Sequence, residues 1–438
     1  MQAGNLRYKM KRLFYFCYNV ATILLLPGLF LFLAFRLLRR PEYRVGLSER
    51  FGFYPNLPTP TGGRRFWIHA VSVGEAISAG VFIQQLRAKY PDATIIVSTG
   101  TPTGRAAAQQ RLVGVDRIVY LPFDFFWIVR RAIRRLAPTC FILLETELWP
   151  NVLCILGKMG TPVLLMNGRI SGRSLARYRC VRRFLPHLFG TFRAMLMQTS
   201  EDVARIAALG APREKLFCTG NMKYDQAAAK PQKTAATLRA DLGFGGRLLM
   251  IAASLHPGED APTLSAYQTL RKILASVPPP ALLMAPRHLT RLDEMEARVA
   301  RCGLTCIRKT AVTSRHNCDV MLLDTLGELD VFYAVGDLIF VGGSLVPVGG
   351  HNVLEAAAYG KPVFFGPHME NFQDVAAQLK QSGGGIQISD ANEMAEAMAR
   401  LLRHPEEMRK RGEAAFTVVM TNRGAVARNL AHLTAWID

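Results

Sequence analysis

Acidic side chains follow two short apolar runs in the first half of this 438-residue chain. Glu75 ends the segment HAVSVGE, whose first residues continue an apolar run that is typical of a buried strand. Glu145 and Glu147 belong to the segment ETELWPN, which directly follows a second such run. Two carboxylates at the end of a buried strand are costly without a purpose. Glu75 and Glu145 are therefore candidates for residues that do chemistry.

Each carboxylate also has a structural interpretation. Glu75 precedes a helical pattern, where a negative charge is stabilised by the helix dipole. We expect Glu147 to cap the next helix, whereas Glu145, at the tip of its strand, is expected to face a cleft. Small residues near Glu75, namely Ser72 and Gly74, leave backbone NH groups uncovered and favour the close approach of a ligand.

Lys223 lies in the segment GNMKYD, close to the expected junction of two domains. Most lysines are solvated surface residues. Lys223 is therefore a candidate functional residue only because of the segments around it. Further on, a GGS segment at residues 342–344 and a GGHNVLE segment at 349–355 are typical of an anion site, because glycines and a helix start expose NH groups. We expect Glu355 one turn inside that helix, within reach of nucleotide ribose hydroxyls, although structural turns explain many such loops.

Two other segments follow apolar runs in the second half, PRH at residues 286–288 and LGE at 326–328. An arginine in the first can clamp a phosphate or stack on a base. The second offers backbone groups to a base edge. There is no Asp-x-Asp pair and no zinc-like spacing among the eight cysteines, so we expect no metal and no cofactor. Protein cations and helix dipoles would then neutralise a leaving group.

These segments lie in a chain whose apolar runs alternate with longer amphipathic segments, which predicts parallel sheets covered by helices. The runs named as strands are residues 66–70, 94–99, 117–121, 141–144, 248–253, 281–285, 320–323, 338–341 and 363–365. The expected fold is α/β of the GT-B type, with two doubly wound Rossmann-like domains that face a cleft. We place the domains at 41–225 and 241–416, with a linker at 226–240 and a C-terminal helix at 417–438 that crosses back to the first domain.

An uncharged run from Leu13 to Phe35 is long enough for a membrane helix and lacks a small-residue cleavage site. We therefore expect residues 1–40 to form a single uncleaved N-terminal anchor, the alternative being a helix that lies in the membrane interface. The net charge of +21 implies an anionic partner, namely nucleic acid, an acidic membrane surface or a phosphorylated substrate. Seven arginines and no acid occur in residues 169–193, which predicts a basic face.

Together these segments resemble the 3-deoxy-D-manno-octulosonic acid (Kdo) transferases, from the N-terminal run to nearly the last residue. The resemblance also covers the matching stretches at residues 43–54, 101–104, 167–171 and 342–371. It implies an inverting glycosyltransferase that transfers Kdo from CMP-Kdo to a lipid A precursor, lipid IVA, during lipopolysaccharide core biosynthesis. It also implies the cytoplasmic face of the inner membrane as the site of action.

By resemblance, Glu75 is the general base, and Glu145 and Lys223 stabilise the transition state. The segments that resemble the family's CMP-binding segments are Pro286, Arg287, Leu326, Gly327, Glu328, Asn352, Val353, Leu354 and Glu355. The residues predicted to face the acceptor or the anionic membrane surface are Ser72, Gly74, Arg169, Arg177, Arg182 and Arg183. The rival interpretations are a peptidoglycan N-acetylglucosaminyl transferase and a basic, membrane-tethered nucleic-acid-binding protein. The motifs speak against the first rival, and the lack of any nucleic-acid-binding module speaks against the second, so no nucleic-acid partner is expected.

Overall fold

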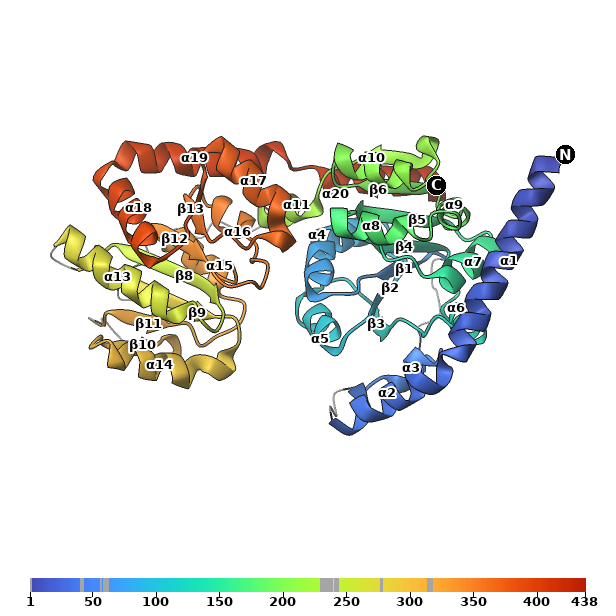
Figure 1. The fold of residues 1–438 in the computed structure, drawn as a ribbon, viewed down its shortest axis with the longest axis horizontal. Helices are drawn as coiled ribbons and strands as arrows, with labels where there is room; N and C mark the ends of the chain where they lie inside the picture. Colours follow the sequence, from blue (N-terminus) through green and yellow to red (C-terminus); the bar gives the residue numbers. More distant parts are fainter. Residues whose placement is uncertain are drawn as a thin grey trace. The chain divides into compact units, whose positions relative to one another are not determined.

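The computed structural model describes residues 2–39, 43–55, 57, 63–228, 239, 244–275, 279–312 and 318–438. The chain divides into two compact units (Figure 1). Unit 1 comprises Met1–Gln226 and Arg423–Asp438, and unit 2 comprises Ala227–Asn422. The linker predicted at 226–240 lies largely outside the described residues, and the predicted cleft between the domains stays a prediction.

Unit 1 contains a seven-stranded parallel sheet in the order β3-β2-β1-β4-β5-β6-β7. Its strands are β1 Arg65–His69, β2 Thr94–Thr99, β3 Arg117–Tyr120, β4 Cys140–Leu144, β5 Val163–Gly168, β6 Ala194–Met197 and β7 Leu216–Cys218. The chain builds outward from β1 to β3 and then returns to place β4 beside β1. The carboxyl ends of β1 and β4 are therefore the switch point of the sheet, where ligands bind in doubly wound folds.

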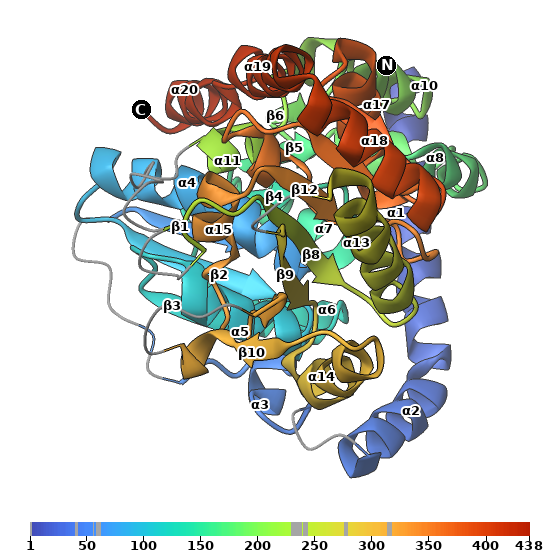
Figure 2. The same ribbon diagram turned by 90° about the vertical axis from the view of Figure 1, so that its left-hand side faces the viewer.

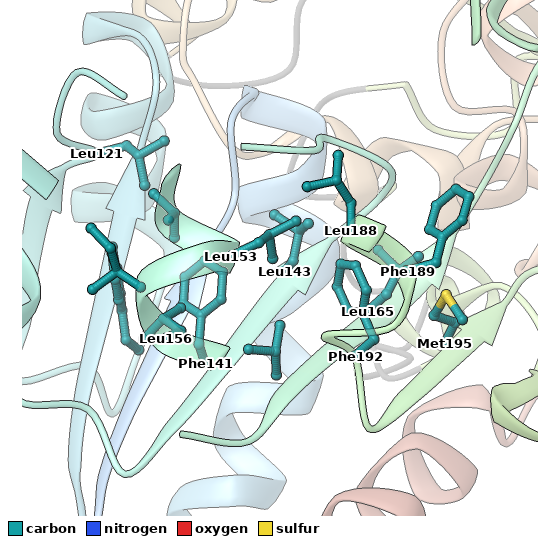
Figure 3. Close-up of a cluster of buried hydrophobic side chains, with 14 of the residues drawn as sticks. Leu121, Phe141, Leu143, Leu153, Leu156, Leu165, Leu188, Phe189, Phe192 and Met195 are labelled. Atoms are coloured by element: carbon teal, nitrogen blue, oxygen red, sulfur yellow. The ribbon is translucent and has the colours of Figure 1, made fainter. Parts of the chain in front are cut away.

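Helices cover both faces of this sheet because its strands are apolar on both sides. The helices of unit 1 beyond its N-terminal pair are α3 Leu47–Arg50, α4 Val73–Lys89, α5 Pro102–Arg111, α6 Phe126–Leu136, α7 Pro150–Lys158, α8 Gly172–Arg179, α9 Leu185–Phe189, α10 Ser200–Ala208, η2 Arg213–Lys215, α11 Met222–Ala228 and α20 Ala425–Ile437. On one face, Phe141 and Leu143 of β4 pack with Leu153 of α7 and Leu188 of α9 (Figure 3). Ile142 faces the opposite way, toward α4 and α20.

Unit 2 repeats this plan with a parallel sheet in the order β10-β11-β9-β8-β12-β13-β14. Its strands are β8 Leu249–Leu255, β9 Ala281–Pro286, β10 Cys306–Arg308, β11 Val320–Leu322, β12 Leu338–Val341, β13 Val363–Phe365 and β14 Gly385–Gln387. Its helices are α13 Asp260–Leu274, η3 Leu289–Arg291, α14 Leu292–Arg301, η4 Lys309–Ala311, α15 Leu329–Val335, α16 Leu354–Ala357, η5 Glu370–Phe372, α17 Gln373–Ser382, α18 Ala391–Arg403 and α19 Pro405–Thr421. Helices α13 and α18 lie side by side (Figure 2). The switch point here lies between β8 and β12.

The two doubly wound α/β domains predicted from the sequence are confirmed. The sequence did not name β5, β6, β7, β10 or β14. Three of these, β7, β10 and β14, have only three residues each and form sheet edges. The predicted start of the crossing helix at residue 417 is wrong, because α19 continues through Thr421 and belongs to unit 2.

The C-terminal helix α20 packs on α4 within unit 1. Asp225 lies near the end of the first segment of unit 1, Met1–Gln226. Its carboxylate accepts hydrogen bonds from the backbone NH groups of Gly424 at 2.7 Å and Val426 at 3.0 Å. Arg428 of α20 donates from Nε to the carbonyl of Thr219 at 2.8 Å. Asp225 thus caps α20 across the chain, because α20 has no side-chain cap of its own at Gly424.

The single N-terminal membrane helix is wrong as predicted, because the segment forms two helices, α1 Gln2–Leu24 and α2 Leu26–Arg39. Pro27 explains the break, since proline has no NH and its ring clashes with the carbonyl four residues earlier. Across the described part of the chain, no single helix is long and apolar enough to cross a membrane. The pair formed by residues 13–24 and α2 passes that test only together, with a bend of 43°.

Helix α1 lies against unit 1 through polar as well as apolar contacts. Tyr18 donates from its hydroxyl to Asp124 at 2.8 Å, and the amides of Asn19 and Asn151 are hydrogen bonded at 3.1 Å. The ring of Phe14 stacks on Phe184 with centroids 4.9 Å apart. On its outer side α1 exposes large apolar residues, namely Leu13, Phe16, Val20, Ile23 and Leu24.

We expect Asp225→Ala to lower the free energy of unfolding of unit 1 by about 1–2 kcal/mol, because two NH groups at the start of α20 lose their acceptor. Urea denaturation followed by circular dichroism measures the change. Glu214→Ala, an exposed position of the same unit, serves as the control. Equal stability of the two variants would show that Asp225 does not hold α20 in place.

Candidate active site

Glu75 lies in the first turn of α4, directly after β1. Ser72 is the N-cap of this helix, and its hydroxyl accepts the NH of Glu75 at 3.3 Å and donates to Glu75 Oε1 at 2.8 Å. The backbone NH of Val71 donates to Glu75 Oε2 at 2.8 Å. Glu75 therefore completes a capping box, in which the acid reaches back to the chain before the helix. Glu75 thus has the structural role at the start of α4 that the sequence allowed. The same hydrogen bonds fix its carboxylate at the switch point.

Glu145 follows β4, the strand next to β1, and is half-buried. Its φ angle is +55°, in the left-handed region that favours glycine, and its NH donates to the carbonyl of Met166 at 3.0 Å. Lys223 approaches Glu145 with Nζ 4.0 Å from Oε1. This distance is at the outer limit of an ion pair, so the two charges attract without a tight hydrogen bond.

The position of Lys223 depends on Asn167 at the end of β5. The Asn167 side chain accepts the backbone NH of Met222 at 3.1 Å, and its φ angle is +54°. Asn221 in turn accepts the NH of Lys223 at 3.0 Å. These bonds anchor the start of α11 beside the strand ends, and so bring the lysine to Glu145.

Burial and, after it, the nearby carboxylates of Glu145 and Glu147 raise the pKa of Glu75 to about 7, against the hydrogen bonds from Val71 and Ser72. Burial and Glu145 also raise the pKa of Glu147. Beneath them, burial lowers the pKa of His69 to about 4, so this histidine is neutral. An acid with a pKa near neutrality is suited to accept a proton at the working pH.

The structure thus brings Glu75, Glu145 and Lys223 together within unit 1, at the switch point of its sheet. A carboxylate with a raised pKa, a second carboxylate and a cation can take up a proton and stabilise both signs of developing charge. Ser72 and Gly74 are exposed beside them. The Ser72 hydroxyl is already hydrogen bonded to Glu75, and acceptor contacts by these two residues stay predictions.

The expectation that Glu147 caps α7 is wrong. The NH groups of Asn151 and Val152, at the start of α7, both donate to the carboxylate of Asp124 at 3.0 Å. Asp124 comes from the loop before α6, so this cap is distant in sequence. The same carboxylate accepts the hydroxyl of Tyr18 in α1.

The basic segment predicted in residues 169–193 divides between two edges of the sheet. Arg169 donates its backbone NH to the hydroxyl of Thr146 at 3.2 Å, so it lies beside the Glu145 segment. Tyr178 of α8 donates to the Thr146 carbonyl at 3.2 Å, which places α8 at the same edge. Six of the seven arginines of this stretch are exposed, and Arg177, Arg182 and Arg183 are among them. Arg193 does not belong with them, because it precedes β6 at the amino edge and lies over the ring of Trp436.

In unit 2, the predicted nucleotide-binding segments all follow strands at the carboxyl edge. Pro286 is the last residue of β9, and Arg287 is exposed directly after it. Leu326 is exposed and Gly327 has a φ of +84°. Glu328 pairs with Lys309 at 3.0 Å, and a hydrogen bond from Thr325 lowers its pKa. Contact of these residues with a nucleotide stays a prediction.

In the glycine-rich loop after β12, three backbone NH groups already have an acceptor. Its NH groups at residues 343, 344 and 345 donate to the buried carboxylate of Glu259 at 2.6, 3.0 and 2.9 Å. Glu259 also accepts the NH of His256 at 2.9 Å. These three NH groups already have an acceptor within the protein, so they are not available to an anion.

The expected helix start in this loop is also different. Helix α16 begins at Leu354 and has four residues, so Glu355 lies in its first turn and not one turn inside. Asn352 accepts the NH of Leu354 at 3.2 Å and donates to Glu355 at 3.4 Å, while Val353 and Leu354 are buried. The side chains of Asn352 and Glu355 are therefore the groups that this segment can offer to a ligand.

Sequence reasoning missed Glu259, Asp124 and Asn167 because each acts on backbone groups far along the chain. A signal for Glu259 existed, since the segment SLHPGED follows β8 in the way that HAVSVGE continues from β1. Within the described ranges, no group of three His, Cys, Asp or Glu side chains is arranged to hold a metal ion.

A family model described as 3-deoxy-D-manno-octulosonic-acid transferase matches residues 45–226, which include Glu75, Glu145 and Lys223. A 3-deoxy-D-manno-octulosonic acid transferase of Haemophilus influenzae is 35% identical over 427 residues, covering 97% of this chain and 99% of the relative. This chain belongs to the 3-deoxy-D-manno-octulosonic acid transferase family. The resemblance drawn from the motifs is confirmed, as is the prediction of a glycosyltransferase.

Solved structures similar to this Kdo transferase show the fold. A UDP-GlcNAc 2-epimerase from Neisseria meningitidis aligns with a TM-score of 0.60 and 14% identity, covering 85% of this chain and 100% of its own. A glycosyltransferase from Rickettsia africae aligns with a TM-score of 0.55 and 12% identity, covering 84% and 97%. The two α/β units of the Kdo transferase are therefore GT-B-like.

We expect kcat/KM of this Kdo transferase to fall as the pH is lowered through about 7, because Glu75 must be deprotonated to act as a base and its pKa is about 7. Glu145→Gln removes a neighbouring negative charge, so the acid limb should move to lower pH even though the maximal rate falls. A pH profile of kcat/KM measures both effects. The exposed Glu214→Gln should leave the limb in place, and an unmoved limb in Glu145→Gln would contradict the coupling.

Proposed function

We propose that this enzyme transfers Kdo from CMP-Kdo to lipid IVA, the lipid A precursor, with inversion at the anomeric carbon, during lipopolysaccharide core biosynthesis. The observation that carries the proposal is the carboxylate of Glu75 at the switch point of unit 1, with a pKa raised to about 7, in a chain of the Kdo transferase family. The acceptor is assigned to unit 1 and the donor to unit 2.

In the proposed reaction, Glu75 takes the proton of a primary hydroxyl of the lipid disaccharide as that oxygen attacks the anomeric carbon of Kdo. The attack comes from the side opposite CMP, so the C–O bond to the phosphate breaks and the configuration inverts. The bonding electrons leave with the phosphate of CMP. A base that loses its proton near neutral pH supports this step, because it is partly deprotonated at the working pH.

Glu145 and Lys223 are the proposed stabilisers of the transition state. The carboxylate of Glu145 offsets positive charge that develops on the sugar, while Lys223 and Arg287 offset negative charge on the departing phosphate. The distance of 4.0 Å between Lys223 Nζ and Glu145 Oε1 supports this role, because it places a cation and a carboxylate beside the same reacting centre. The proposal needs no metal ion.

We also propose that the enzyme works at the cytoplasmic face of the inner membrane, held there by α1, α2 and the basic residues near α8. The exposed apolar side of α1 supports this placement, since interfacial helices bury such a side at the level of the lipid headgroups. Arg177 precedes Tyr178, whose hydroxyl donates to the Thr146 carbonyl beside Glu145, and Arg182 and Arg183 are exposed shortly after it. We assign these arginines to the phosphorylated lipid.

We expect Glu75→Gln to lower turnover by about two to four powers of ten, as is typical for loss of a general base. Glutamine keeps the capping box, so the fold and CMP affinity should be retained. Steady-state kinetics with lipid IVA and calorimetry with CMP measure the two quantities. Ser72→Ala, which weakens the cap but keeps the carboxylate, should lower turnover far less. Turnover near wild type in Glu75→Gln would remove this residue from the mechanism.

The triple variant Arg177→Gln, Arg182→Gln, Arg183→Gln should bind anionic vesicles more weakly and show a higher KM for lipid IVA. Each charge near the surface contributes on the order of 1 kcal/mol. Raised salt should reproduce the effect in the wild type, because exposed charges are screened within about 8 Å at physiological ionic strength. Arg193→Gln, at the opposite edge, is the control. Unchanged vesicle binding at low salt would mean that these arginines are ordinary solvated surface.

A further inference from the structure

Three histidines from separate segments meet at the carboxyl edge of unit 2. His256 follows β8 and His351 lies in the loop after β12, and their Nε2 atoms are 2.8 Å apart. The two rings are nearly parallel, with centroids 5.0 Å apart and an interplanar angle of 14°, and they meet edge to edge at this hydrogen bond. His288, which follows β9, lies edge-on to His256 at 6.0 Å. Neither the mechanism above nor the predicted nucleotide-binding segments account for the pair of His256 and His351.

The position of this pair is the switch point of unit 2, because β8 and β12 are neighbours and the strand order reverses there. In doubly wound sheets, ligands bind outside the carboxyl ends of the strands at this point. The equivalent position in unit 1 holds Glu75 and Glu145. The histidine pair therefore occupies the place in unit 2 where the fold itself favours a ligand.

A glycine beside the pair lets the two imidazole rings lie close to the backbone. Gly343 has a φ of +68°, and a Cβ added there would lie 2.9 Å from Cδ2 of His351 and 3.4 Å from Cδ2 of His256. Real Cβ atoms do not approach a ring carbon so closely, so only glycine leaves room for His351 in this position. The pair is thus built into the loop after β12.

The charged groups around the pair favour an anion. Arg287 and His288 are exposed at its rim. The remaining arginine near it, Arg291, pairs with Asp260. The carboxylate of Glu259 is nearby, but it already accepts four backbone NH groups.

Burial, followed by the surrounding cations, lowers the pKa of His351 to about 4. Burial likewise lowers the pKa of His256. Both imidazoles are therefore neutral near pH 7, and one Nε2 carries the hydrogen that it donates to the other. An oxygen atom that arrives at this point replaces the accepting nitrogen as the partner of that hydrogen.

We propose that His256 and His351, with Arg287 and His288 at the rim, bind the phosphate of the nucleotide-sugar donor. This inference rests on the proposed donor site in unit 2 and deepens it. A phosphate has oxygens enough to accept from an imidazole and a guanidinium at once, and such bonds to a charged acceptor are the stronger kind. The NH groups of residues 343–345 donate to Glu259, so these three groups do not compete with the side chains for the phosphate.

The test compares the affinities of CMP and cytidine, which differ only by the phosphate. In His256→Gln and His351→Gln, CMP affinity measured by calorimetry should fall about tenfold, as expected on losing a hydrogen bond to a charged group. Cytidine affinity should stay unchanged. His404→Gln, at an exposed position of the same unit, is the control. Gly343→Ala should reproduce the loss with all histidines present, because it displaces His351.

Retention of the full preference for CMP over cytidine in both histidine variants would overturn the inference. An equal loss of affinity for CMP and cytidine would also overturn it, because the histidines would then act on the fold and not on the phosphate. A loss of affinity for free Kdo without loss for CMP would assign the pair to the sugar carboxylate instead. If the wild-type enzyme binds cytidine as tightly as CMP, the proposed donor site itself fails.

Discussion

Parallel pairing of the strands is the constraint on which the rest of this structure depends. Within each described sheet all strands point the same way, so their carboxyl ends share one edge and their helices cover both faces. Each sheet also reverses its strand order once, which leaves two neighbouring strand ends uncovered by a crossing connection. In unit 1 these ends carry Glu75 and Glu145, and in unit 2 they carry His256 and the loop to His351. The strand order of each sheet therefore determines where its candidate site lies.

Much of this arrangement could be predicted, because the residues that end a strand and begin the next helix are neighbours in the sequence. The run before Glu75 is apolar throughout, and the small residues after it begin a helix, so both the strand end and the helix start are visible in the sequence. The position of Lys223 beside Glu145 was harder to predict, because it depends on Asn167. That residue is distant in sequence and has a left-handed backbone conformation. The acceptor of the NH groups at residues 343–345 was missed for a similar reason, because Glu259 is distant from them in the sequence.

The same distant carboxylates tie segments together. Asp124 caps α7 and binds Tyr18 of α1, and its pKa is raised to about 6 because burial outweighs the hydrogen bonds that it accepts. Asp225 does a comparable task for α20. Single buried or half-buried acids thus hold loops between strands and helices in this protein. Sequence periodicity does not reveal them, because their partners are distant in the sequence. The N-terminal helix is joined through Asp124 to α7, and α7 directly follows the segment that carries Glu145.

Glu145 has a consequence for the evolution of this site. A side chain at φ +55° stores conformational strain of roughly 1–3 kcal/mol, and glycine would release it. The folded state would thus be favoured by removing the carboxylate altogether. In a library selected for thermal stability alone, glycine should rise in frequency at this position. The role proposed for Glu145 predicts that selection for turnover retains the acid. At the end of β4, the most stable fold therefore favours glycine, whereas the proposed activity requires glutamate.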